Sequence, residues 1–180
     1  VLFLKGCFSG THFHFILYPP GVFDILKGTE IYLNMNYLQK YILKKETLNM
    51  DGIIFDVDGT LLDTSRNILQ SLKDALAETD GIHREIDELR FVLGCTSLVS
   101  LAQLKVRNAS ETLGLWLENE ARYVHLIRLF DGIEPLLEKL SESGYRLGIV
   151  TSRTHEELEL VLSAAPIQNY FSVIICSDDV

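Results

Sequence analysis

The chain has 180 residues, and 47% of them are hydrophobic, which is enough for a sizeable core. We therefore expect a folded protein rather than a disordered one. A formal net charge of −9 argues against a nucleic-acid backbone or an anionic membrane surface as the main partner. The three cysteines form no CxxC or Cys/His spacing, so neither a disulfide framework nor a zinc site is expected. A reducing cytoplasm is therefore the expected compartment.

Residues 1–49 differ from the rest of the chain. They carry five Lys/Arg against three acids and show no sustained helical or alternating period. Their apolar residues are interrupted by Lys, Gly, Thr, His and Pro, and no run reaches the roughly 18 apolar residues of a membrane span. We therefore interpret this segment as an atypical N-terminal extension.

A second interpretation concerns the gene. Lys45-Glu46 can be encoded by the purine-rich AAGGAG, three codons before Met50, which resembles a bacterial ribosome-binding site and start codon. The hypothesis is that the native protein begins at Met50 and that residues 1–49 are not naturally translated. Mass spectrometry of the endogenous N-terminus, if it found residues before Met50, would contradict this.

The first element expected after residue 49 is a strand. The apolar run Gly52 to Asp56 is short and continuous, as in strands buried on both faces. From Thr64 the period becomes helical, with Thr64 or Ser65 available as N-cap and Gly81 beyond the end. The apolar face of this helix consists of Ile68, Leu69, Leu72, Ala75 and Leu76.

Further helical stretches are expected at about 84–93, 97–106 and 110–129. The last places an apolar stripe on one face, which is interpreted as the core of a small helical subdomain: Leu113, Trp116, Leu117, Ala121, Val124 and Ile127. No convincing strand is found between about 65 and 130.

The final 50 residues return to alternating elements. Pro135 suits the first turn of a helix that ends near Gly144, and "YRLGIVTSR" gives a second buried strand. Thr154 and Glu157 fit a capping box at the start of another helix. "FSVIICSDD" gives a third strand, Ser172 to Cys176.

This succession predicts an α/β fold with a parallel sheet. Right-handed crossovers place the carboxyl ends of all three strands on one edge, where such sheets bind ligands. The polar residues that follow the three strands are Asp56, Asp58, Thr151, Ser152 and Ser177 to Asp179.

Two aspartates one residue apart at the end of a buried strand, Asp56 and Asp58, repel each other unless a cation or hydrogen bonds offset the repulsion. A carboxylate can attack phosphorus to form an aspartyl-phosphate, and Mg²⁺ is a natural partner because it takes carboxylate and phosphate oxygens together. The plain alternative is a solvated Asp-Gly turn. For Thr151 and Ser152 it is an ordinary strand end before a helix cap.

"DVDGT" (Asp56 to Thr60) continuing into "LLDT" resembles the first motif of haloacid dehalogenase-like phosphohydrolases, and "GIVTS" (Gly148 to Ser152) resembles their second. The resemblance is to the phosphoglycolate-phosphatase-like and pyrophosphatase-like members. It implies a Rossmann-like parallel sheet, with residues 50–64 and 131–180 as the α/β core and 65–130 as an inserted helical cap. Asp58 argues against the dehalogenase branch, which lacks this second aspartate.

The resemblance also implies roles for residues. Asp56 would be the nucleophile and a Mg²⁺ ligand, while Asp58 would protonate the leaving group, activate water and bind the metal through its carbonyl. The hydroxyl of Thr151 would bind a phosphoryl oxygen, Gly59 would allow a close turn, and Asp63 would help Thr60 to shape the loop. Backbone N–H groups of Val57, Asp58 and Ser152 would add donors. The implied phosphate-binding set is Val57, Gly59, Thr60, Thr151 and Ser152.

The chain also departs from the family pattern. The expected lysine and the later acidic metal ligands are missing before the chain ends at "CSDDV", and Arg153 is the nearest basic residue after the second motif. We expect a C-terminally truncated product that binds Mg²⁺ weakly and turns over poorly. The resemblance implies a Mg²⁺-dependent phosphatase of a small metabolite such as phosphoglycolate or pyrophosphate. The alternatives are a sugar-phosphate mutase and an inert fragment or binding module.

The remaining polar and sulfur-containing residues are given plain interpretations. Asp178 and Asp179 are expected in an exposed loop, and Cys176 as a buried strand residue. Cys95 is interpreted as an incidental thiol. The histidines without a partner pattern are expected on helix surfaces: His83, His125 and His155.

Overall fold

The computed structural model describes residues 2–9, 12–18, 31–33, 52–93 and 95–180, which fall into two compact units. The first unit, called the core unit below, comprises Val1–Asp63 and Leu129–Val180. The second, called the helical unit, comprises Thr64–Arg128. Among the described residues, no helix is long and apolar enough to cross a membrane.

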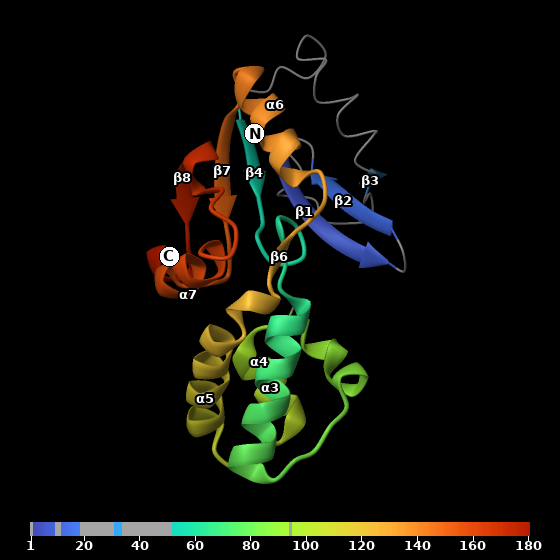
Figure 1. The fold of residues 1–180 in the computed structure, drawn as a ribbon, viewed down its shortest axis with the longest axis vertical. Coiled ribbons are helices and arrows are strands. Elements are labelled where there is room, and N and C mark those ends of the chain that lie inside the picture. The colour runs from blue at the N-terminus through green and yellow to red at the C-terminus, as the bar shows by residue number, and fades with distance from the viewer. Residues whose placement is uncertain (1, 10–11, 19–30, 34–51, 94) are drawn as a thin grey trace. The chain divides into compact units, whose positions relative to one another are not determined.

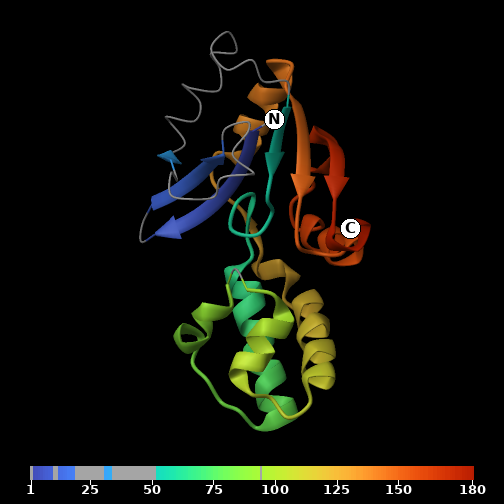
Figure 2. The same ribbon diagram turned by 180° about the vertical axis from the view of Figure 1, so that it is seen from behind.

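A six-stranded sheet forms the centre of the core unit, with the order β3-β2-β1-β4-β7-β8 (Figure 1). The strands expected from the sequence are β4 (Gly52–Phe55), β7 (Arg146–Val150) and β8 (Phe171–Ile175). They are parallel neighbours, and Figure 2 shows them side by side from behind. The predicted parallel α/β sheet is confirmed, with β8 beginning one residue earlier than expected.

Three further strands precede β4: β1 (Leu2–Ser9), β2 (His12–Tyr18) and β3 (Ile31–Leu33). β1 and β2 pair antiparallel, and β1 joins β4 in parallel. The sequence showed no strand period here, because hairpin and sheet pairing is made by backbone groups and does not require alternating side chains. The hypothesis of a start at Met50 concerns a residue outside the described ranges and stays a prediction.

Two helices of the core unit follow their sequence signals. α6 (Ile133–Glu142) has Pro135 in its first turn and buries Leu136, Leu137 and Leu140. α7 (His155–Leu162) begins with the predicted capping box, in which the Glu157 N–H donates to the Thr154 hydroxyl over 3.3 Å. In return, the Thr154 N–H donates to the Glu157 carboxylate over 2.8 Å.

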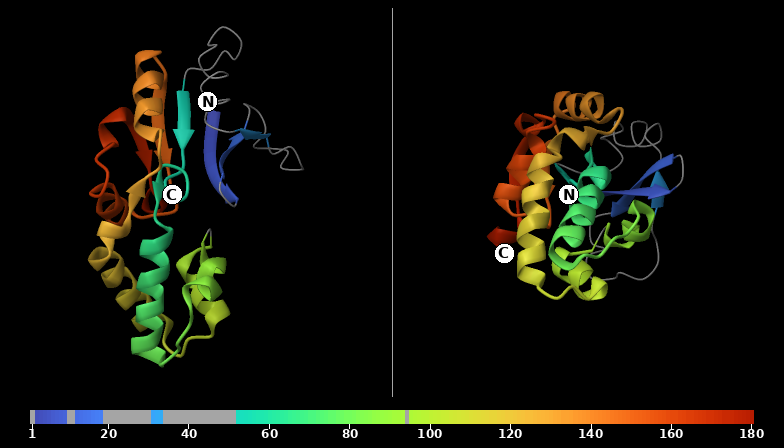
Figure 3. Two further views of the ribbon diagram at one scale, coloured as in Figure 1. Left: turned by 45° about the vertical axis from the view of Figure 1, so that its right-hand side comes forward. Right: turned by 60° about the horizontal axis from the view of Figure 1, so that its bottom comes forward.

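The helical unit begins with α3 (Ser65–Asp80), which ends at Gly81 in a left-handed conformation, as predicted. A 3₁₀ helix (Ile86–Val92), α4 (Ser97–Leu104) and α5 (Ala109–Arg122) follow. α3 and α5 lie side by side, as Figure 3 shows.

Two sequence expectations for this region are wrong. The third helix was expected to continue to about residue 129, but α5 ends at Arg122 and is followed by a 3₁₀ turn. The strand β6 (Arg128–Leu129) then pairs with β5 (Leu62–Asp63). Strands of two residues are too short to produce a periodic pattern, so the sequence could not indicate them.

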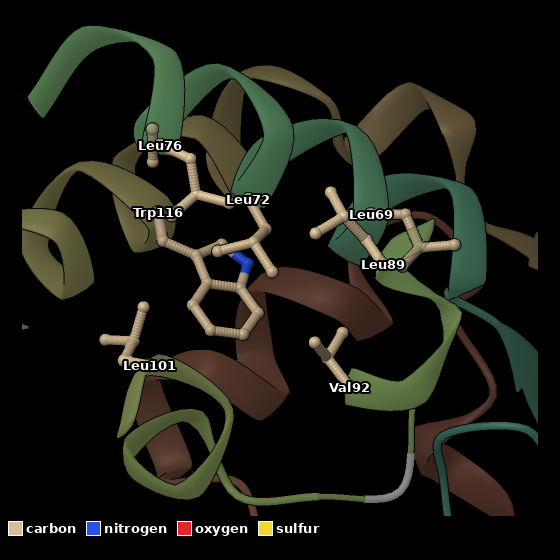
Figure 4. Close-up of a cluster of buried hydrophobic side chains, with 8 residues drawn as sticks. Leu69, Leu72, Leu76, Leu89, Val92, Leu101 and Trp116 are labelled. Atoms are coloured by element: carbon tan, nitrogen blue, oxygen red, sulfur yellow. The ribbon is translucent and has the colours of Figure 1, made fainter. Parts of the chain in front are cut away.

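A single apolar cluster holds the helical unit together (Figure 4). Trp116 of α5 packs against the apolar face of α3, and residues of the 3₁₀ helix and α4 complete the cluster. Most of the predicted apolar face of α3 is therefore buried, although Ile68 is only partly so. The buried members are Leu69, Leu72, Ala75, Leu76, Leu89, Val92, Leu101 and Trp116.

Candidate active site

The loop after β4 carries the two aspartates. Asp56 directly follows the strand, and both Asp56 and Asp58 are half-buried. The loop is closed by the Gly59 N–H, which donates to the Leu62 carbonyl over 2.9 Å, while Gly59 itself has a φ of 71°. This left-handed conformation favours glycine, so Gly59 takes the turn-forming role expected of it.

The second polar segment follows β7. Because β4 and β7 are parallel neighbours, with Phe55 opposite Ile149, their carboxyl ends meet at one edge of the sheet. Thr151 is buried there, and its N–H donates to the Ile175 carbonyl over 3.0 Å. Ser152 is exposed. The sheet therefore brings both sequence motifs to one edge.

Arg153 connects the two loops. Its guanidinium donates from Nε to Oδ2 of Asp58 over 2.8 Å and from Nη2 to Oδ1 over 2.9 Å. The Arg153 side chain is 9% exposed and that of Asp58 28%. The sequence left Arg153 without a role. The sequence feature that could have indicated a role is its place three positions after a buried strand, at the same sheet edge as an acidic pair.

The implied phosphate-binding set is only partly accessible. Thr60 is fully buried, so its hydroxyl does not face solvent, and its N–H donates to the Val57 carbonyl over 3.2 Å. The N–H of Val57 donates to Oδ1 of Asp56 over 2.8 Å. In the structure, Thr60 therefore shapes the loop and Val57 orients the Asp56 carboxylate. For Thr60, this agrees with the loop role inferred from the motif, and its place in the phosphate-binding set stays a prediction.

The segment after β8 gathers a different group of polar side chains. His155, Cys176, Asp178 and Asp179 have potential metal-ligand atoms within 4.8 Å of one another. Hydrogen bonds join these residues: the Cys176 N–H donates to Asp179 over 2.8 Å, His155 Nε2 lies 3.0 Å from Asp179, and the His155 N–H donates to Asp178 over 3.1 Å. Cys176 is buried, as expected, but lies directly after β8 rather than in it, and the two aspartates are exposed, as expected. His155 has an acidic partner that the sequence did not indicate.

Three of these four residues have shifted pKa values. Burial, followed by the charges of Asp178 and Asp179, raises the pKa of the Cys176 thiol. The hydrogen bond to Asp179 raises the pKa of His155. The Cys176 N–H, and then His155, lower the pKa of Asp179.

The donor set on the loop after β4 fits a hard divalent cation. Asp56 offers a half-buried carboxylate at the carboxyl end of a strand, and Mg²⁺ prefers oxygen ligands of this kind. Because both carboxylate oxygens of Asp58 accept hydrogen bonds from Arg153, its main-chain carbonyl is the better candidate ligand. Asp56 and the Asp58 carbonyl are therefore the residues that would hold Mg²⁺.

The acidic pair follows β4 and the threonine follows its parallel neighbour β7, so both lie at the carboxyl edge where α/β proteins bind ligands. The family model described as haloacid dehalogenase-like hydrolase matches residues 53–180. The chain belongs to this haloacid dehalogenase-like hydrolase family.

Curated relatives share part of their length with the chain. Pyrophosphatase PpaX of Bacillus velezensis is 27% identical over 131 residues, which is 72% of this chain and 60% of that protein. Tyrosine-protein kinase PtkA of Mycobacterium tuberculosis is 32% identical over 124 residues, covering 68% of this chain and 43% of that protein. The chain thus spans about 60% of the length of the pyrophosphatases that it matches.

Solved structures give the same fold. A haloacid dehalogenase-like hydrolase from Streptococcus pneumoniae is 27% identical, with a TM-score of 0.65 over 71% of this chain and 61% of that chain. A protein from Lactobacillus plantarum, provisionally named a phosphoglycolate phosphatase, is 27% identical with a TM-score of 0.64, covering 73% of this chain and 63% of that chain. The predicted family and fold are confirmed.

Proposed function

We propose that the protein is a phosphohydrolase that removes a phosphoryl group from a small phosphorylated metabolite through an aspartyl-phosphate intermediate. The observation that supports this best is the meeting of Asp56, Asp58 and Thr151 at one edge of the sheet, with Arg153 on Asp58. The names of its relatives make pyrophosphate and phosphoglycolate the first substrates to test.

In the first step, an oxygen of Asp56 attacks phosphorus and the bond from phosphorus to the leaving oxygen breaks. Asp58 gives its proton to that oxygen, and Thr151 holds a phosphoryl oxygen through its hydroxyl. The Val57 N–H, which donates to Oδ1 of Asp56, keeps the carboxylate oriented after the strand end.

In the second step, Asp58 accepts a proton from water as the water oxygen bonds to phosphorus. The bond from phosphorus to Asp56 breaks, inorganic phosphate leaves, and the Asp56 carboxylate is restored. Asp56 and the Asp58 carbonyl would hold Mg²⁺, which would supply positive charge to stabilise the phosphoryl oxygens. We propose that the helical unit, residues 65–130 in the sequence interpretation, acts as the cap that selects the substrate.

Phosphate release tests this function. With Mg²⁺ present, we expect the chain to release phosphate from pyrophosphate or phosphoglycolate, Asp56→Asn to abolish release, and Asp58→Asn nearly to abolish it. With 4-nitrophenyl phosphate, whose leaving group departs without a proton, mass spectrometry of Asp58→Asn should detect a protein heavier by one phosphoryl group, because the first step needs no acid and the second lacks its base. The matched control is Asp131→Asn, which changes an exposed acid of the same unit.

Each other outcome contradicts a defined part of the proposal. If Asp56→Asn released phosphate as fast as the wild type, Asp56 would not be the nucleophile. If the wild type released no phosphate, this chain would not be a phosphohydrolase. Isomerised product from a hexose 1-phosphate, without free phosphate, would identify a mutase instead. If the chain transferred a phosphoryl group from ATP to a tyrosine of an added peptide, it would act as a tyrosine kinase, the activity in the name of the mycobacterial relative.

A further inference from the structure

The pair formed by Arg153 and Asp58 is not required by either sequence motif. It joins residues 95 positions apart by two parallel N–H···O contacts of 2.8 and 2.9 Å. Arginine forms this two-point arrangement with a carboxylate because its donors lie in one rigid plane, and such charge-assisted hydrogen bonds are about twice as strong as neutral ones. The pair therefore fixes the rotation of the Asp58 carboxylate as well as its position.

Both ends of the pair are anchored by backbone contacts. The Arg153 carbonyl accepts the Ser177 N–H over 2.9 Å, and the Arg153 N–H donates to the Thr151 hydroxyl over 3.3 Å. On the other side, Asp58 forms a β-bridge with Leu62, next to the hydrogen bond that closes the loop. The guanidinium thus approaches Asp58 from a segment tied to the ends of β7 and β8.

The low exposure of Arg153 distinguishes this pair from a surface salt bridge. Only 9% of its side chain is exposed, so the guanidinium has little water to replace a lost carboxylate partner. Surface pairs of the same residue types contribute little because both partners remain hydrated. The position of Asp58 is consequently coupled to that of Arg153.

We propose that Arg153 is a positioning residue that holds the Asp58 carboxylate in the orientation needed to accept a proton from water. This inference rests on the proposed function, because it assigns Asp58 the base role in the second step. Each carboxylate oxygen has two acceptor positions, so one N–H contact on each oxygen is compatible with proton transfer to Asp58. A misplaced base lowers the chemical rate without weakening substrate binding.

The first test needs no turnover. Unfolding equilibrium constants are measured in urea for the wild type, Asp58→Asn, Arg153→Gln and the double variant. We expect a coupling of at least about tenfold between the two sites, because each single change removes the two-point contact from a side chain with limited access to water. Coupling below about twofold would overturn the inference whatever the activity.

The second test separates the two chemical steps with 4-nitrophenyl phosphate. Its leaving group departs without a proton, so formation of the aspartyl-phosphate does not need Asp58 as an acid. For Arg153→Gln and Arg153→Lys we expect a retained initial burst of nitrophenolate and a steady-state rate lower by about 10- to 100-fold. KM should fall by a similar factor, so that kcat/KM is unchanged, because only the second step is slowed. Lysine should not rescue the rate, because it keeps the charge but not the two-point geometry.

The control is Arg146→Gln, which changes an exposed arginine at the amino end of β7 and should leave the steady-state rate unchanged. A raised KM with a slower burst would make Arg153 a phosphate ligand and overturn the positioning role. Wild-type rates in both Arg153 variants would also overturn it and leave the proposed function standing. Absence of nitrophenolate from the wild type would instead contradict the proposed function.

Discussion

Single ionic contacts organise both loops at the carboxyl edge of the sheet, but in different surroundings. Arg153 is almost buried on Asp58, whereas His155 and Asp179 are 54% and 39% exposed in their side chains. The exposed pair joins the first residue of α7 to the turn after β8. Its contribution should therefore be small and should depend on pH and salt.

We predict a pH dependence of stability from this exposed pair. The pKa of His155 is raised above its ordinary value of 6.5, so its stabilising contribution is complete below that value and is lost as the pH rises through the raised pKa. The pKa of Asp179 is lowered below 3.8, so its contribution is complete above that value and is lost as the pH falls through the lowered pKa.

The pair should thus stabilise the fold most between about pH 3.8 and 6.5. The free energy of unfolding in urea should be measured below and above the upper pH limit. Its decrease as the pH rises should be smaller in His155→Gln than in the wild type. His83→Gln, which changes an exposed histidine of the helical unit, is the control. Equal pH dependence in all three proteins would contradict the prediction.

Among the elements, α7 has the clearest local determinant. Its capping box satisfies backbone donors that the first turn of a helix cannot satisfy within the helix. Thr154→Ala should lower the free energy of unfolding by about 0.5–2 kcal/mol. Chemical denaturation measures this, with Ser141→Ala on an exposed position of α6 as the control. A control variant that loses as much stability as Thr154→Ala would show that the effect does not come from the cap.

The elements predicted well from the sequence are those with strong local signals. β4 is a continuous apolar run, α3 has a cap residue and a terminal glycine, and α7 has its capping box. Elements defined by distant partners were missed: β1 gains its place by pairing with β4, and β6 by pairing with β5. Neither segment shows the sustained alternation or apolar run by which a strand can be identified in a single sequence.

The residues of the candidate site also differ in how well the sequence predicts them. Asp56 and Asp58 could be identified because their spacing after an apolar strand is itself a pattern. The contact of Arg153 with Asp58 depends on the register between β4 and β7, which the sequence does not encode locally. The burial of Thr60 likewise depends on how the loop packs.

At the scale of the whole molecule, the chain contains two units with separate cores. The eight buried residues of the cluster in Figure 4 all belong to the helical unit. Leu72→Ala should destabilise that unit by about 2–5 kcal/mol, because it removes a fully buried side chain and leaves a cavity. Hydrogen exchange should then speed up more for amides of α3 and α5 than for those of β7.

The control for that experiment is Leu98→Ala, because Leu98 is 66% exposed and its truncation opens no cavity. Equal acceleration of exchange in β7 and α3 by Leu72→Ala would mean that both units unfold together. The separate cores would then act as one cooperative system.

The outer strand β8 has a practical consequence for anyone who purifies this chain. In the described sheet it has a neighbour on one side only, and Val173 and Ile175 are 55% and 37% exposed. An apolar strand with unpaired backbone groups is a template on which another polypeptide can add a strand. Concentrated samples should accordingly be prone to aggregation that begins at β8, even while the edge bearing Asp56 and Asp58 stays correctly folded.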